Sequence, residues 1–169
     1  LVNRGICALR YYYTYVVLLR ETTCMSVIDV WSQIQTERMA KEPWLETLLK
    51  WTKQTDSLVV PTVRSTLQAM NEAGVNISIL SAWHGPHGSL ISNQEVSDQI
   101  DQAPDRFRGL VSVDLNKPME AVREIRKWVD KDRFVGVRVV PWLWDLPPNN
   151  RKYYLVYTAC VDLGVPFCT

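Results

Sequence analysis

The chain has 169 residues, enough for one domain of ordinary size, and 47% of them are hydrophobic. It can therefore bury a core and is not a disordered segment. Nineteen Lys and Arg against 18 Asp and Glu give a formal net charge of +1. This balance does not support nucleic-acid binding, which needs a clustered excess of cations. With 7 Gly, 9 Pro and 4 Cys, collagen-like, low-complexity and disulfide-scaffold proteins are excluded as well.

The four cysteines show no Cys-x-x-Cys spacing and no accompanying histidines; they are Cys7, Cys24, Cys160 and Cys168. The sequence therefore predicts neither a zinc finger nor a thioredoxin-like redox motif. Cys160 and Cys168 lie in apolar runs, which is typical of reduced, buried thiols. Reduced thiols favour a cytoplasmic location.

Residues 1–25 differ in character from the rest of the chain. A basic start leads into nine mostly apolar residues, from Tyr11 to Leu19, whereas a helix needs about 20 to cross a bilayer. No small-residue cleavage site follows, so neither a signal peptide nor a membrane partner is predicted. The tyrosine-rich run has strand propensity. We nevertheless expect residues 1–25 to be an N-terminal extension of unknown role or an upstream read-through, since Met25 can serve as the initiator. One domain is expected over 26–169.

Short apolar runs alternate with amphipathic ones along residues 26–169. The patterns predict strands at 27–30, 75–82, 110–113, 135–140 and from 165, and helices at 63–73, 93–103, 119–129 and 153–163. Asn93 is expected to cap its helix, and Gly74 to end the first one. The units recur at intervals of roughly 25 to 35 residues, as βαβ crossovers require.

Strands that alternate with helices predict an α/β fold with a parallel sheet. No Gly-x-Gly-x-x-Gly or Walker motif follows a strand, which counts against nucleotide binding and favours a TIM barrel. About four and a half βα units make the N-terminal half of a (β/α)8 barrel. We expect the domain to be truncated at strand five, with its first and last strands as unpaired edges. Open edges lead us to expect dimerisation or aggregation, and hence a possible homo-oligomer.

Several segments carry a family resemblance. They are Pro104–Gly109 leading into VSVDL, Ala121–Ile125, Phe134–Val139 and Tyr154–Phe167. Their order and spacing resemble the amidohydrolase-related family (amidohydrolase 2) of metal-dependent TIM barrels. The most similar members are those grouped with aminocarboxymuconate semialdehyde decarboxylase. The resemblance covers roughly residues 26–169, the N-terminal portion of such a barrel.

The resemblance implies a metal-dependent hydrolase or non-oxidative decarboxylase acting on a small carboxylated or aromatic substrate. A divalent ion, zinc, would activate a water molecule. The His-x-His pair that ends the family's first strand falls on Trp31 and Gln33, neither of which is a good zinc ligand. The other family ligands lie beyond Thr169, so no metal ligand is assigned here. We expect the 169-residue chain alone to be inactive. The alternative is a catalytically silent barrel fragment or a pseudo-enzyme with only a binding role.

The chain has only two histidines, and both lie in the loop after the second strand. The loops at this end of a barrel surround the active site. His84 is therefore the candidate general acid or base, because imidazole titrates near neutral pH. The alternative is a solvent-exposed turn on which Trp83 stacks.

Arg138 interrupts an otherwise apolar strand. A guanidinium at a barrel mouth suits bidentate capture of a substrate carboxylate; the alternative is a structural ion pair. Trp142 follows in the next loop and is a candidate wall of a substrate pocket, or else a residue that packs against another subunit. The candidate substrate-binding residues are Trp31, Gln33, Trp83, Arg138 and Trp142.

Overall fold

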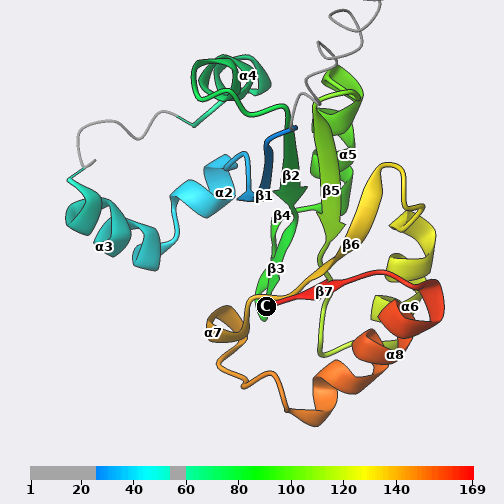
Figure 1. Cartoon of the computed structure of the whole chain (residues 1–169). Helices are drawn as coiled ribbons and strands as arrows, with labels where there is room; N and C mark the ends of the chain where they lie inside the picture. Colours follow the sequence, from blue (N-terminus) through cyan, green and yellow to red (C-terminus); the bar gives the residue numbers. More distant parts are fainter. Residues whose placement is uncertain (1–25, 54–59) are drawn as a thin grey trace, which may run out of the picture.

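The computed structural model describes residues 26–53 and 60–169. Its main sheet contains five strands, all parallel: β1 (Ile28–Ser32), β2 (Ile77–Ser81), β5 (Phe107–Val111), β6 (Phe134–Arg138) and β7 (Phe167–Cys168). Each strand pairs with the next one along the chain, and the sheet curls into half a barrel (Figure 1). This confirms the predicted half of a TIM barrel.

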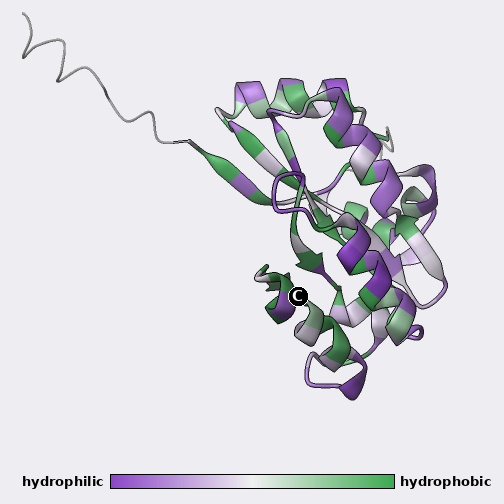
Figure 2. Cartoon of the chain, turned by 90° about the vertical axis from the view of Figure 1, so that its right-hand side faces the viewer, coloured by the Kyte–Doolittle hydropathy of each residue, from purple (hydrophilic) through white to green (hydrophobic). Residues whose placement is uncertain are grey.

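A helix precedes each later strand of the sheet, as βαβ crossovers require. These helices are α4 (Val63–Glu72), α5 (Asn93–Gln102), α6 (Pro118–Trp128) and α8 (Tyr154–Leu163), the last after the short 3-10 helix η1 (Arg151–Tyr153). They carry both hydrophilic and hydrophobic residues (Figure 2). Among the described residues no helix is long and apolar enough to cross a bilayer.

The cap of α5 differs from the expectation. Ser92, not Asn93, is the N-cap residue, and it forms a reciprocal capping box with Glu95. The Asn93 amide instead donates to the Ser112 carbonyl (3.1 Å) and accepts from the Ser112 N–H (2.9 Å). Asn93 therefore ties the start of α5 to the loop after β5.

The loops at the carboxyl ends of the strands contain elements that the sequence patterns did not predict. These are α2 (Glu37–Ala40), α3 (Pro43–Thr52), a hairpin of β3 (Trp83–Gly85) with β4 (Gly88–Ile91), and α7 (Pro141–Trp144). The hairpin replaces the expected loop around the two histidines. Gly88 adopts φ +125°, a conformation that other residues rarely take, and so allows the tight turn.

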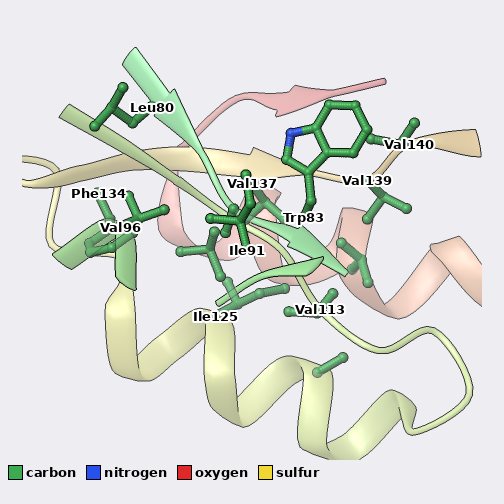
Figure 3. Packing of buried hydrophobic residues seen from close by; sticks show 14 of the residues in the cluster. Leu80, Trp83, Ile91, Val96, Val113, Ile125, Phe134, Val137, Val139 and Val140 are labelled. Atoms are coloured by element: carbon green, nitrogen blue, oxygen red, sulfur yellow. The ribbon is translucent and has the colours of Figure 1, made fainter. Parts of the chain in front are cut away.

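The core lies between the sheet and the helices that cover it. Leu80 and Val137 of the strands cluster with Val96 of α5 and Ile125 of α6, and none of the four is measurably exposed (Figure 3). Apolar side chains are exposed, not buried, on β1, the outermost strand at one side of the described sheet. Its apolar residues Ile28 and Val30 are 49% and 59% exposed.

Candidate substrate site at the carboxyl-terminal edge of the sheet

The carboxyl ends of three strands bring together side chains that are far apart in the sequence. Trp31 lies in β1, Trp83 begins β3 just after β2, and Arg138 is the last residue of β6. Because all strands of the main sheet are parallel, these ends meet at one edge, where the active sites of barrels are found. The Cζ atom of Arg138 lies 3.7 Å from the ring centroid of Trp31 and 4.9 Å from that of Trp83.

The Arg138 guanidinium is buried without a counter-ion among the described residues. The residue is 3% exposed, and its Nε and Nη1 atoms have no hydrogen-bond partner. No ion pair of the described part of the chain includes it. Burial lowers its pKa to about 10, against a smaller opposing effect of Cys168, so the group remains a cation at neutral pH. In the part of the chain that the structure describes, the two indole rings are the groups that offset its charge.

A tryptophan cluster adjoins the guanidinium. Trp44 of α3 stacks on Trp83, with ring centroids 6.0 Å apart, and Trp142 of α7 meets both rings edge-on at 5.0 Å and 6.0 Å. The three rings line a cavity of about 310 Å³ together with Gln33, whose Oε1 is buried without a hydrogen-bond partner. The structure therefore brings the predicted residues Gln33, Trp83 and Trp142 to one cavity.

His84 lies in β3 and lines a different cavity, of about 360 Å³, between the hairpin, α5 and α6. Its ring stacks on Trp144 at 6.1 Å, and its carbonyl accepts a hydrogen bond from the Trp144 Nε1–H at 2.8 Å. Its backbone N–H donates to Ser112 Oγ, and its Nδ1 is buried without a partner. His84 thus shares a strand with Trp83 but not its cavity, and its role as a general acid or base stays a prediction.

Trp44 is the site residue that our sequence analysis missed. It lies in a segment for which no element was predicted, and helix α3 carries it to the cavity. The signal was present: Trp44, Leu48 and Trp51 are spaced by four and three residues, the spacing of one face of a helix. All three line the cavity.

The described residues do not form a site for a divalent metal ion. No group of three or more His, Cys, Asp and Glu side chains is placed to hold one in residues 26–53 and 60–169. Trp31 has no ligand atom and Gln33 offers one neutral oxygen. The Arg138 cation lies against the Trp31 ring, and the Asp29 carboxylate accepts a hydrogen bond from the Trp31 backbone N–H at 3.0 Å.

The cysteines do not change this conclusion. Cys160 and Cys168 are free, as predicted. Burial raises the pKa of Cys160 to about 11. Burial also raises the pKa of Cys168, although the nearby positive charge of Arg138 has a smaller effect that lowers it. Both side chains are therefore neutral thiols at pH 7, whereas a thiolate is the form that binds metal.

Comparisons with known proteins agree with this architecture. The family model described as amidohydrolase matches residues 91–168. This match confirms the resemblance seen in the sequence over residues 91–168, which are similar to the amidohydrolase family.

About half of each of several solved structures superposes on this half barrel. An uncharacterized TIM-barrel protein from Bordetella bronchiseptica superposes with a TM-score of 0.65 and 19% identity, over 85% of this chain and 54% of its own. The manganese complex of 5-carboxyvanillate decarboxylase from Novosphingobium aromaticivorans has a TM-score of 0.66 and 16% sequence identity. This match covers 84% of this chain and 49% of the decarboxylase chain. The 2,6-dihydroxybenzoate decarboxylase from Rhizobium has a TM-score of 0.61 and 18% sequence identity, and the match covers 84% of this chain and 48% of the decarboxylase chain. The chain thus spans about half the length of the structures it matches.

Proposed function

We propose that this chain is part of an amidohydrolase-related enzyme, a hydrolase or non-oxidative carboxy-lyase that acts on a small carboxylated or aromatic substrate. The observation that carries the proposal is the buried guanidinium of Arg138 at the carboxyl edge of the sheet, which has no counter-ion within residues 26–53 and 60–169. A buried charge without a partner is costly, and a carboxylate would supply both the opposite charge and two acceptor oxygens. Two of the similar structures are named as decarboxylases of aromatic acids, which supports this choice.

The described residues divide the work of binding such a substrate. Arg138 holds the carboxylate, and the indoles of Trp31, Trp83 and Trp142 pack against its apolar part. The free Oε1 of Gln33 accepts a hydrogen bond from a substrate hydroxyl. His84 remains the proposed acid or base. We expect this enzyme in the cytoplasm.

Similar decarboxylases are crystallised with manganese, and the proposal for the whole protein keeps a divalent ion, zinc or manganese, as cofactor. Such an ion polarises a substrate oxygen or acidifies a water when bound. The described residues do not supply its ligands, so we assign no step of the reaction to it.

A second candidate function is that of a pseudo-enzyme, which binds a ligand without turning it over. The observation that favours it is the pair Trp31 and Gln33, which stands where the family carries its first two metal ligands. Both readings share the carboxylate site. They differ only in whether chemistry follows binding.

The test is an assay of the full-length protein for CO2 release from 5-carboxyvanillate and 2,6-dihydroxybenzoate, and for hydrolysis of their carboxamides. We expect turnover of at least one carboxylated substrate. Loss of a hydrogen-bonded charge costs about 1.5–3 kcal/mol, so Arg138→Ala should lower kcat/KM for carboxylated substrates about 10- to 100-fold and spare uncharged ones. Binding without turnover would establish the pseudo-enzyme, and neither binding nor turnover would overturn both readings.

A further inference from the structure

We propose that this chain binds a planar carboxylate on Arg138 without a divalent metal ion, and that Trp31 makes the site select planar acids. The inference rests on the proposed function, because it concerns the same site. It goes further in naming the class of ligand, the residue that selects it and the absence of a metal requirement.

The first step concerns charge. The ring of Trp31 lies 3.7 Å from the Cζ atom of Arg138, so the end of β1 adjoins a buried cation. A divalent ion held at this strand end would be repelled by the guanidinium, and low polarity around buried groups strengthens such repulsion. The same charge attracts an anion. The site thus favours the carboxylate itself over a metal ion that would bridge to it.

The second step concerns the shape of the guanidinium. It is planar: its faces interact with aromatic rings and its N–H bonds lie in its plane. Here the indoles of Trp31 and Trp83 lie against Arg138, while Nε and Nη1 have no partner. A carboxylate therefore binds edge-on, in the plane of the guanidinium. The body of an aromatic acid lies in that same plane and can stack on the indoles, whereas a saturated ring is too thick to do so.

The third step concerns Trp31. Its side chain belongs to the outermost described strand, and the residue is 53% exposed, so it is not part of the core. It nevertheless makes the shortest contact with Arg138. Trp31 thus covers one face of a buried cation while its own side chain is half exposed to solvent. Replacing it changes the surroundings of Arg138 without removing a core side chain.

The test uses the whole chain after treatment with EDTA and dialysis, and calorimetric titration with benzoate, cyclohexanecarboxylate and benzamide. We expect benzoate to bind without metal, at least tenfold more tightly than benzamide and several-fold more tightly than cyclohexanecarboxylate. Addition of Mn²⁺ or Zn²⁺ should change the benzoate Kd less than twofold. Arg138→Gln should abolish the preference for benzoate over benzamide.

Trp31→Leu should reduce the preference for benzoate over cyclohexanecarboxylate to less than twofold. The matched control is Tyr154→Leu, which changes an aromatic residue of similar exposure (57%) on α8 and should leave all affinities unchanged. Far-UV circular dichroism verifies that each variant is folded.

The outcomes separate this inference from the proposed function. Benzoate binding only after Mn²⁺ or Zn²⁺ is added would overturn the metal-free site and leave the carboxylate enzyme standing. An unchanged acid preference in Trp31→Leu would overturn the role of Trp31 alone. Failure of the folded wild-type chain to bind benzoate in any condition, or undiminished binding by Arg138→Gln, would overturn the carboxylate site and with it both proposals.

Discussion

Arg138 places a positive charge at a buried position of a strand, where a protein core ordinarily holds an apolar side chain. The strand around it is apolar, its neighbours Val137 and Val139 are fully buried, and no described carboxylate approaches it. A charge in such surroundings loses hydration, and this loss is what lowers its pKa to about 10. We therefore expect Arg138 to lower the free energy of unfolding of the free chain, and a bound anion to raise it.

This cost predicts that Arg138→Met makes the free chain more stable, by about 1 kcal/mol or more, because an apolar side chain of similar length removes the buried charge. Urea unfolding followed by circular dichroism measures the change. The control is Arg106→Met. Arg106 donates to the carbonyls of Asn76 (2.8 Å) and Val75 (2.9 Å), so its loss should destabilise the chain by about 1 kcal/mol. A less stable Arg138→Met would show that the guanidinium has a structural partner.

The lowered pKa of Arg138 also predicts the pH dependence of binding. The guanidinium is protonated below about pH 10, and benzoate is ionised between pH 6 and 9, so affinity should be constant over that interval. Above pH 10 the free chain loses the proton that the carboxylate needs, and affinity should fall. Calorimetric titration at each pH measures this. A fall between pH 6 and 7 would instead indicate that a histidine takes part in binding.

At the level of elements, the packing of β5 against β6 depends on a glycine. A Cβ atom on Gly109 would lie 2.7 Å from the Phe134 ring and 3.1 Å from Ile100 of α5. The absence of a side chain thus lets the Phe134 ring lie across β5 and under α5. This close approach keeps β6, and with it Arg138, in the register that places the guanidinium at the sheet edge.

Gly109→Ala should therefore destabilise the chain by about 1–3 kcal/mol, the usual cost of overpacking. The double variant Gly109→Ala with Phe134→Leu should be less destabilised than the sum of the two single changes, because the smaller side chain makes room for the new methyl group. Urea unfolding of the four proteins gives this coupling. Strict additivity would contradict the proposed contact.

On the scale of the molecule, the outer strands of the described sheet are β1 and β7, and β1 exposes a run of apolar side chains. An exposed strand edge with apolar residues favours association with other chains. We predict that the chain self-associates at tens of micromolar, measured by light scattering after size-exclusion chromatography. Val30→Lys on β1 should weaken the association.

The control for this prediction is Val161→Lys, a change at an even more exposed valine (81%) that lies on helix α8 and not on β1. It should leave the association unchanged. A monodisperse monomer that unfolds cooperatively would contradict the prediction.

Much of the fold could be predicted from local patterns, because each strand and helix of the barrel layers has its own periodicity. The elements that were missed are short and lie in the loops. Helix α2 has four residues, α7 has four, and β3 has three, too few for a period to show. Helix α3 has ten residues, long enough for its apolar spacing to indicate a helix.

For this protein the sequence by itself determined the parallel order of strands and helices, the family resemblance and the set of candidate residues, because these depend on spacing along the chain. Only the tertiary structure decided which candidates meet. It placed Trp31 and Trp83 against Arg138, which has no ion-pair partner among the described residues. It also added Trp44 to the cavity of Trp83 and Trp142 and put His84 in another. The physical reason is that contacts across the sheet edge depend on strand register and on loop conformations, and neither is encoded in the period of any single segment.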